Sequence, residues 1–505
     1  MAAASSASLI GCKPFLIKIS VKSFQGLPKL VFLGMSRSRA VEIRDKITAA
    51  IKVSGYRLRS CRTVINLRPA AAGECDQLEL AAAVGLLAEN DIISADYEQT
   101  LIVGSLDLDG SVKPIPGILS YLRLAKELGL DEVILPAGNY HQAQLVNGID
   151  LIPATNLQQV VRWLNCHQRP KCDQPQPKKD KREQLGVNFS DVIGQDLAKR
   201  ALTLAAAGRH HILLVGPPGV GKTMLAECAR KLLPRLSSNH IKETTEIYCL
   251  DQHHSQVVVK QPPFRQPQMN ISSTEFFGGG RWLRPGEVSL AHHGVLFIDE
   301  LPQLSRSILA GLAQVLESKQ IKLTRNIGTC SYPADVMLIA AMNPCPCGYY
   351  QTNLKPCQCG PAQRDRYWQR LSGALLDRID LIVRLQPVKM DADSQRSNSQ
   401  PVEIGKQQIK QIWDKQQQRY QHLPAAFNSD LDSRHIRKLI RLDSNCRRLL
   451  QEAAANLKLS TRTYFKVIKL ARTIADLADE SAIQPAHIQE ALSYTADSKL
   501  RDTKN

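Results

Sequence analysis

Apolar and polar positions in residues 1–165 alternate between short strand-like runs and longer helical patterns. The strand-like runs are FLIKI, LVFLG, TVINL, TLIVGSLDL and EVILP, and the helical segments are ELAAAVGLLAEN and LSYLRLAKELG. Short runs rich in β-branched residues predict strands, whereas apolar residues spaced three and four positions apart predict helices. We therefore expect an α/β unit in this part of the chain.

Two polar segments divide the rest of the chain. Residues 166–186 contain prolines and many charges, and we expect a linker because they cannot bury enough apolar surface to fold. In residues 187–387 the runs HILLVG, GVLFID and VMLIAA are almost entirely apolar, as is typical of parallel strands covered by helices on both faces. After a polar joint at residues 388–405, residues 406–500 show helical spacing, which predicts a small helical domain. The overall fold class is α/β.

Composition adds limits on size and surroundings. A chain of 505 residues is too long for one hydrophobic core, and 43% hydrophobic residues with no long apolar run predict a soluble protein outside the membrane. The N-terminus lacks the pattern of a secretory signal, and the 13 cysteines are an odd and mostly dispersed set. We expect a cytoplasmic protein with reduced thiols.

The charge balance favours a polyanionic partner. Lysine and arginine number 65 against 47 acidic residues, a formal net charge of +18, which attracts nucleic acid. A basic, solvated surface without a dedicated partner would give the same balance. Charge alone does not decide between the two.

The segment GPPGVGKT fits the phosphate-binding pattern G-x-x-x-x-G-K-[ST], and it follows a predicted strand and precedes a predicted helix. Its glycines let backbone amides turn toward phosphate oxygens, Lys222 neutralises the outer phosphates, and the Thr223 hydroxyl can hold Mg²⁺. The predicted ATP-binding residues are Gly216, Pro217, Pro218, Gly219, Val220, Gly221, Lys222 and Thr223, with Asp299 as a further Mg²⁺ contact.

Two more strands end in polar residues. GVLFIDE ends in Asp299 and Glu300, of which Asp299 would reach the metal through water and Glu300 would deprotonate the attacking water. VMLIAAMN ends at Asn343, whose amide could position the same water. An acidic turn and a turn-forming asparagine would look alike in the sequence.

Two arginines are candidates to stabilise the charge that develops on the transferred phosphoryl group. Arg378 lies in LSGALLDRIDL, and Arg462 opens the helical run TRTYFKVIKLARTIADL. An arginine supplied by a neighbouring subunit would make the active site a property of the subunit interface. Either residue could also be an ordinary surface arginine.

Four cysteines follow Asn343 in NPCPCGYYQTNLKPCQCG. Their pattern C-x-C-x₉-C-x-C could close on one structural Zn²⁺, with all four coordination positions filled by thiolates. The other reading is a set of reduced thiols in a loop rich in proline and glycine. The candidate zinc ligands are Cys345, Cys347, Cys357 and Cys359.

Two segments carry cations that could contact DNA. STEFFGGGRWLRPGE joins aromatic rings and arginines around glycines, and KQIKLTRNIGTCSYPADVML predicts a basic hairpin. Each segment could instead pack against its neighbours. The residues singled out are Phe276, Phe277 and Trp282 for stacking, and Arg281, Arg284, Lys319, Lys322 and Arg325 for DNA contact.

Together, GPPGVGKT, RPGEVSLAHHGVLFIDELPQLSRSILAGLAQVLES, AAMNPCPCGYY and LSGALLDRIDL resemble the Mg-chelatase-like AAA+ family of ComM/YifB type, and the likeness extends into the N-terminal third through GSLDLDGSVKPIPGIL. The resemblance implies a ring-forming ATPase, commonly a hexamer, and for the ComM branch a helicase that drives branch migration during natural transformation. It also implies the roles Lys222 and Thr223 for Walker A, Asp299 and Glu300 for Walker B, Asn343 for sensor 1, Arg378 for a trans finger and Arg462 for sensor 2 of a helical lid.

The N-terminal third resembles the fold of the Lon protease domain. A working Lon-type site needs a serine and a lysine, whereas GECDQLELAAA has no serine and Leu122 stands at the lysine position. Cys75 lacks an activating neighbour, because Lys113 precedes the helix and Lys126 comes late in it. We expect an inactive scaffold that contacts DNA or builds the ring.

Some loops depart from the family pattern. Gln268 and Met269 replace a histidine pair after FRxP, and AGECDQLEL replaces a KEG…DLP stretch. The nucleotide residues are intact, so the departures put the substrate in question and not the ATPase. We expect an ATP-driven DNA motor; the alternative is a chelatase-type ATPase that remodels a protein partner.

Overall fold

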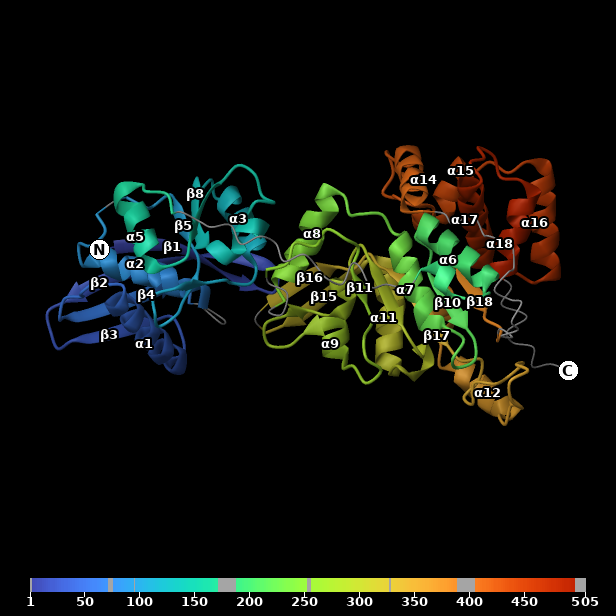
Figure 1. Ribbon diagram of the computed structural model, residues 1–505, viewed down its shortest axis with the longest axis horizontal. Coiled ribbons are helices and arrows are strands. Elements are labelled where there is room, and N and C mark those ends of the chain that lie inside the picture. The colour runs from blue at the N-terminus through green and yellow to red at the C-terminus, as the bar shows by residue number, and fades with distance from the viewer. Residues whose placement is uncertain are drawn as a thin grey trace.

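The computed structural model describes residues 2–70, 76–94, 96–170, 188–251, 256–326, 328–387 and 405–495. The chain forms three parts in a row, with an N-terminal α/β part at one end, a core with a parallel sheet in the middle and a helical part at the other end (Figure 1). Cys75, residues 171–186 of the expected linker and residues 388–404 of the expected joint lie outside the described residues.

The N-terminal part is built on a seven-stranded sheet in the order β3-β4-β2-β1-β5-β8-β9. Strands β1 and β2 and strands β2 and β4 pair antiparallel, and the other neighbours are parallel. The runs predicted from sequence are all present. The strands are β1 (Ala2–Ile10), β2 (Lys13–Phe24), β3 (Lys29–Leu33), β4 (Arg62–Arg68), β5 (Thr100–Ile102), β8 (Glu132–Pro136) and β9 (Asp150–Ala154).

Helices bury both faces of this sheet. One core forms beneath α1 (Arg37–Val53), α2 (Glu79–Glu89) and α5 (Leu157–Cys166), and a second forms beneath α3 (Ile118–Glu127) and α4 (Tyr140–Ala143). Both helical segments predicted from sequence are confirmed as α2 and α3. A short ribbon of β6 (Ser105–Leu106) and β7 (Val112–Lys113) lies beside the sheet.

Strand β1 was not predicted, because its sequence AAASSASLI consists mostly of alanine and serine and has only one β-branched residue, Ile10, at its end. It nevertheless lies in the middle of the sheet. Ala4 and Ala7 are buried, and the Ser6 hydroxyl donates to the carbonyl of Ile102 at 2.7 Å. Small side chains leave room for the close packing of α2, so tertiary contacts set this strand where local preference does not.

The core sheet contains five parallel strands in the order β11-β14-β17-β10-β18. The three apolar runs predicted as parallel strands are confirmed as β14, β17 and β10. Alternate residues of β10 face different cores, Ile212 and Leu214 on one side and Leu213 and Val215 on the other. The strands are β10 (Ile212–Val215), β11 (Phe264–Arg265), β14 (Val295–Ile298), β17 (Met337–Met342) and β18 (Leu381–Arg384).

Helices cover both faces of the core sheet, as the apolar runs predict. On one face lie α6 (Asp196–Gly208) and α7 (Lys222–Leu232), and on the other α11 (Arg306–Ser318) and α13 (Gly373–Leu376). The remaining helices are α8 (Ser238–Cys249), α9 (Ser273–Phe277), α10 (Glu287–Leu290) and α12 (Pro361–Gln369), and two-residue strands β12 (Gly278–Gly279) and β13 (Arg284–Pro285) pair between α9 and α10.

The C-terminal part is helical, as the sequence predicts, and shares one hydrophobic core with α6 and α7. Trp413 and Ile474 belong to the same buried cluster as Ile212 of the sheet, and the Trp413 indole donates to the carbonyl of Ala206 at 3.0 Å. The helices are α14 (Lys406–Arg419), α15 (Ser433–Leu439), α16 (Ser444–Asn456), α17 (Thr461–Leu477) and α18 (Pro485–Thr495).

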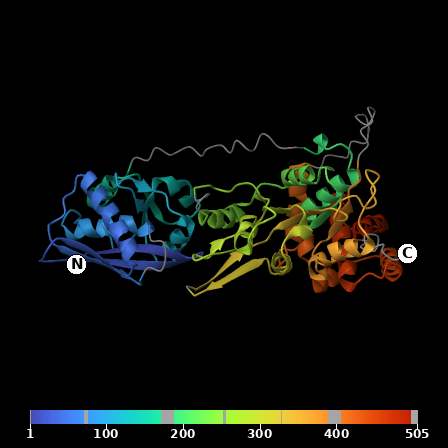
Figure 2. The ribbon, with the colours of Figure 1, turned by 90° about the horizontal axis from the view of Figure 1, so that it is seen from below.

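The N-terminal part contacts the core through the turn between β1 and β2. This turn meets the hairpin of β15 (Gln320–Arg325) and β16 (Gly328–Pro333), as Figure 2 shows. The sulfurs of Cys12 and Cys330 lie 2.8 Å apart, and the Gly117 amide donates to the carbonyl of Cys249 at 2.8 Å. Across the described ranges, none of the helices combines the length and apolar character needed to span a bilayer.

Candidate functional site

The phosphate-binding segment forms the turn between β10 and α7. Gly219 and Gly221 have φ angles of +81° and +84°, in the left-handed region that favours glycine, and Lys222 is the first residue of the helix. The Lys222 ammonium is buried and donates to the carbonyl of Gly216 at 2.8 Å and to Oδ1 of Asn343 at 2.7 Å. The structure therefore brings two of the predicted site residues into contact.

The acidic pair lies at the same edge of the sheet, because β14 and β10 flank β17 and all three are parallel. Burial lowers the pKa of Lys222, while the nearby carboxylates of Asp299 and Glu300 act to raise it. Glu300 has φ of +49°, and its amide donates to Oδ1 of Asp299 at 2.9 Å. Gln303 donates a hydrogen bond to the Glu300 carboxylate, which fixes the carboxylate at the strand end.

Tyr367 on α12 joins this group and was missed by the sequence reasoning. Burial raises the pKa of its hydroxyl to about 12; a hydrogen bond with the backbone of Asn343 acts in the other direction, and the charge of Glu300 adds to the rise. A neutral phenol therefore lies beside both residues expected to handle the attacking water. A tyrosine within RDRYWQRL carries no pattern that would have identified it.

The donor set fits a nucleotide with Mg²⁺. The hydrogen bonds of the Lys222 ammonium go to neutral carbonyl and amide oxygens, and open space surrounds the Cβ positions of Gly219 and Gly221. Phosphate oxygens are stronger partners for a buried ammonium than carbonyl oxygens are. The carboxylates, with the Thr223 hydroxyl at the start of α7, are the oxygen ligands that Mg²⁺ prefers.

The two predicted arginines lie at the opposite edge of the sheet. Arg378 comes just before β18, and its guanidinium pairs with Glu317 at 2.6 Å. Arg462, near the start of α17, pairs with Asp377 at 2.5 Å. The four residues of β10 separate this edge from Lys222 by about 13 Å. The structure therefore does not bring these arginines to the phosphate-binding loop of their own chain.

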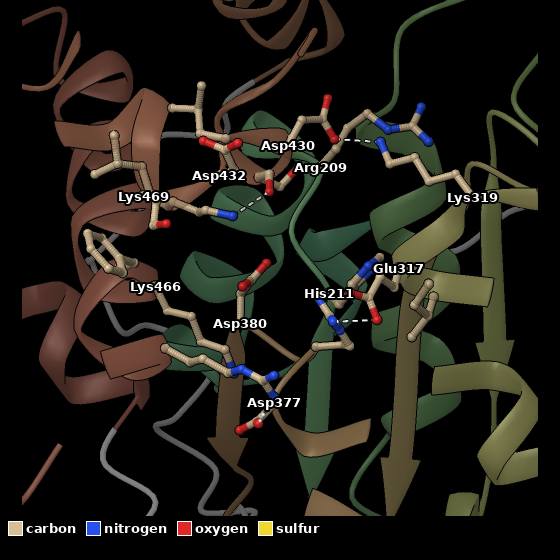
Figure 3. A pocket seen from close by; sticks show the side chains of 18 of the residues that line it. Arg209, His211, Glu317, Lys319, Asp377, Asp380, Asp430, Asp432, Lys466 and Lys469 are labelled. Atoms are coloured by element: carbon tan, nitrogen blue, oxygen red, sulfur yellow. Dashed lines mark hydrogen bonds and ion pairs between the residues drawn. The ribbon is translucent and has the colours of Figure 1, made fainter. Parts of the chain in front are cut away.

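Arg378 and Arg462 line a cavity of about 410 Å³ between the core and the C-terminal helices (Figure 3). Its walls mix cations and carboxylates from both parts, and the lysines Lys466 and Lys469 donate to backbone carbonyls of Ile379 and Ser429. Burial lowers the pKa of His211 in this cavity to about 4, which keeps the ring neutral at physiological pH.

Lys319 also belongs to this cavity, and not to the surface of the basic hairpin. Its ammonium pairs with Asp335 at 2.8 Å and with Asp430 at 2.5 Å. Burial opposes ionisation of Asp335, but Arg209 and Lys319 together hold the pKa of that carboxyl well below its usual range. Lys319 is thus held by two aspartates, which argues against its expected contact with DNA.

The expected hairpin is present as β15 and β16, and Lys322 and Arg325 are exposed on β15. In the aromatic segment the expectation of free stacking faces is wrong for two residues. Phe276 is completely buried, and the Phe277 ring packs against it and against Gly311. The Arg281 guanidinium lies 4.7 Å from the centre of the Trp282 ring, and Arg284 lines a small cavity against the N-terminal part.

The four cysteines of the segment after Asn343 come together, with their sulfurs all within 4.8 Å of one another.

In the N-terminal part, Leu122 is buried in α3, Lys113 pairs with Asp107 at 3.5 Å and Lys126 donates to the carbonyl of Asn147 at 3.4 Å. Cys75 lies outside the described residues, so the expectation of an inactive protease-like domain stays a prediction.

Comparison with protein families covers most of the chain. Residues 188–392 match the family "Magnesium chelatase, subunit ChlI", residues 399–495 match "Magnesium chelatase, subunit ChlI C-terminal", and residues 19–139 match "Subunit ChlI of Mg-chelatase". The matches span the core sheet, the C-terminal helices and most of the N-terminal sheet.

Curated relatives extend over almost the whole length. The chain is 37% identical over 489 residues to the uncharacterized protein YifB of Escherichia coli K12, covering 96% of this chain and 95% of the relative. It is 34% identical over 503 residues to competence protein ComM of Haemophilus influenzae, covering 98% of this chain and 97% of the relative. It is 25% identical over 170 residues to the magnesium-chelatase 67 kDa subunit of Chlorobaculum parvum, covering 31% and 23%. The chain therefore belongs to the Mg-chelatase-like family of ComM and YifB proteins, which are AAA+ ATPases.

Proposed function

We propose that this protein is an ATP-hydrolysing, ring-forming motor that acts on DNA, as a helicase or branch-migration factor in the recombination of incoming DNA. The observation that carries the proposal is the separation of the site into two halves. Lys222, Asp299, Glu300 and Asn343 gather at one edge of the core sheet, and Arg378 and Arg462 gather at the other.

Within one chain, each residue at the carboxyl edge has a distinct task. The Lys222 ammonium exchanges the Gly216 carbonyl and Asn343 amide for phosphate oxygens, and Thr223 and Asp299 would hold Mg²⁺, which would neutralise charge on the phosphates. Glu300 accepts a proton from the attacking water. Asn343 and Tyr367 fix the position of that water from the neighbouring strand and from α12.

The arginine edge supports a ring in which one protomer completes the site of the next. Glu317 is 64% exposed and Asp377 is 37% exposed, and exposed ion pairs contribute only about 0 to 1 kcal/mol. Such partners release the arginines at little cost when a phosphate of the neighbour arrives. A head-to-tail contact of this kind closes into a ring, and we propose a hexamer.

The proposal of DNA as the substrate rests on charge and on one relative. The chain carries a formal net charge of +18, and Lys322 and Arg325 are exposed on the β15–β16 hairpin. The relative from Haemophilus influenzae is a competence protein. We propose that the hairpin tracks the DNA backbone, with Arg281 and Trp282 as a second contact.

A second candidate is an ATPase that remodels a protein partner, as a component of a chelatase. It is favoured by the family matches to the magnesium chelatase subunit ChlI. The two functions share the same ATP site, so only the response to substrate separates them.

The test is ATP turnover with no DNA, with single-stranded DNA, with duplex and with a four-way junction. Branched or single-stranded DNA should raise the rate, and Lys222→Ala should remain inactive under every condition. Turnover that is active but indifferent to every DNA would contradict the DNA motor and favour the remodelling ATPase. A full-length chain that never hydrolyses ATP would contradict both.

A further inference from the structure

The loop that follows Asn343 folds back so that two cysteine pairs meet. Cys345 and Cys347 come directly after β17, and Cys357 and Cys359 come just before α12. The sulfur of Cys345 lies 3.3 Å from that of Cys347 and 3.7 Å from that of Cys357, and the sulfurs of Cys347 and Cys357 are 3.5 Å apart.

These distances match a tetrahedral metal site. Four sulfurs at about 2.3 Å from a central Zn²⁺ lie about 3.8 Å from one another along each edge of the tetrahedron. All four cysteines are free, and no pair among them is bonded. Four convergent sulfurs from two separate turns are the donor set that soft, tetrahedral Zn²⁺ prefers.

The backbone around the sulfurs is arranged for thiolates. The amide of Tyr350 donates to Sγ of Cys345 at 3.3 Å, and the amide of Cys347 donates to Sγ of Cys359 at 3.4 Å. Gly348 follows Cys347 with φ of +86°, a left-handed turn that a residue with a side chain adopts only with strain. Amide donors to metal-bound sulfurs are a common outer shell of thiolate sites.

A partly buried cation lies beside the cluster. Arg364 on α12 donates from Nη1 to the carbonyl of Cys359 at 3.1 Å, and its Nε is buried with no hydrogen-bond partner in the described part of the chain. Four thiols would leave this guanidinium without a counter-charge. Four thiolates around Zn²⁺ carry a net charge of −2, which a neighbouring guanidinium offsets.

The same loop packs on the nucleotide site. A Cβ on Gly348 would lie 2.8 Å from Cδ of Pro218 in the phosphate-binding loop, so the two loops are in close contact. The Trp368 indole donates to the carbonyl of Pro344 at 3.1 Å, next to Asn343. A group that binds the four cysteines would therefore also fix the position of Asn343 and the contact of this loop with the phosphate-binding loop.

We propose that Cys345, Cys347, Cys357 and Cys359 bind one structural Zn²⁺ that clamps this loop onto the phosphate-binding loop. The four thiolates fill every coordination position, so the metal has no open position for substrate. It acts by position, because it fixes the backbone that follows Asn343 and precedes Tyr367. The effect on turnover rests on the proposed function, but the presence of the metal does not.

The first measurement is the metal content of the full-length protein, purified without chelators, by mass spectrometry of the elements. We expect about one zinc per chain and no stoichiometric iron. Replacement of the metal by Co²⁺ should give the visible absorption of a tetrahedral thiolate complex. A protein without zinc, or with iron in its place, would overturn the proposal.

The second measurement compares variants. Cys347→Ser should lower the zinc content at least about fivefold because it removes one of four ligands. Cys166→Ser, at an exposed cysteine outside the cluster, should keep about one zinc per chain. Equal zinc in both variants would overturn the assignment of the ligands. If Cys347→Ser fails to fold, the zinc and Co²⁺ measurements on the parent decide.

A third variant separates this proposal from the proposed function. Lys222→Ala should bind zinc normally and hydrolyse no ATP, so loss of turnover and loss of metal are independent results. In the Cys347→Ser protein, a loosened loop should raise KM for ATP more than it lowers kcat. An unchanged KM in a protein that has lost its zinc would contradict the clamp.

Discussion

The two edges of the core sheet carry similar cations in different surroundings. At the carboxyl edge the Lys222 ammonium donates to the carbonyl of Gly216 and to the amide oxygen of Asn343, and the charges of Asp299 and Glu300 lie nearby. At the amino edge, Arg378 and Arg462 each form an ion pair with a half-exposed or exposed carboxylate. In our proposal the first edge binds phosphate within one chain, and the second presents arginines to a neighbouring chain.

The difference supports our proposal that neighbouring chains share each ATP site. A buried lysine with neutral partners gains when a triphosphate arrives, because charge-assisted hydrogen bonds replace neutral ones. At the other edge, the ion pairs with Glu317 and Asp377 hold the arginine side chains in place until a phosphate displaces the carboxylate. Variants at each edge test this difference.

The largest effects should come from the carboxyl edge. Lys222→Ala and Glu300→Gln should each reduce kcat for ATP at least about 100-fold, because they remove charge stabilisation and the proton acceptor. Glu300→Gln should still bind ATP, whereas Lys222→Ala should bind it weakly. Turnover and equilibrium binding of a fluorescent ATP analogue measure the two properties, and substantial turnover by Glu300→Gln would contradict its role as the base.

Arg378→Ala should cause the next largest loss of ATP turnover. Loss of a finger arginine reduces kcat by about 10³-fold, while binding of ATP to the chain should change little. Arg448→Ala is a matched control, because Arg448 is an exposed arginine on α16 that lies away from the cavity. Glu317→Gln should leave turnover intact, since that carboxylate only holds Arg378. A strong loss in Glu317→Gln would show that the ion pair itself is required.

The hairpin variant tests DNA contact. Lys322→Ala with Arg325→Ala should weaken DNA binding and lower the slope of log K against log salt by about 2, because each lost phosphate contact contributes about 0.9. Binding isotherms at several salt concentrations give the slope. A slope equal to that of the parent would remove the hairpin from the DNA surface.

The smallest effect concerns the contact between the N-terminal part and the core. Gly11→Ala places a Cβ 2.7 Å from the side chain of Cys330, at φ of +62°. Gly129→Ala is the control, because Gly129 has φ of +68° and nothing within 4 Å of the added atom. Both variants carry a similar backbone cost of about 1 kcal/mol, so a larger fall in Tm for Gly11→Ala reports the contact. Equal falls in Tm for the two variants would show that the contact between Gly11 and Cys330 rearranges without loss of stability.

The sequence predicts the elements that are determined by neighbouring residues along the chain. Strands β10, β14 and β17 are apolar throughout, and the polar residues at their ends mark the proposed ATP site because parallel strands gather their carboxyl ends. The four cysteines are recognisable by spacing alone. These features need no knowledge of how distant segments pack.

The sequence does not predict features that depend on tertiary contact. Strand β1 consists of alanines and serines up to Leu9 and Ile10, and its pairing in the middle of the sheet makes it a strand. Phe276 looks like a stacking residue but is completely buried, and Lys319 looks like a DNA contact but pairs with Asp335 and with the distant Asp430. Tyr367 and the edge on which the arginines lie could be found only from the fold.

The most direct test of the two-edge account mixes two inactive variants. Lys222→Ala keeps its arginine edge and Arg378→Ala keeps its phosphate site, so a ring that contains both has some interfaces with two intact halves. In a random mixture about a quarter of the interfaces would be intact, and ATP turnover should recover to a comparable fraction of the parent rate. If the mixture, under conditions in which the parent assembles, stays as inactive as each variant alone, the account that neighbouring chains share each ATP site is wrong.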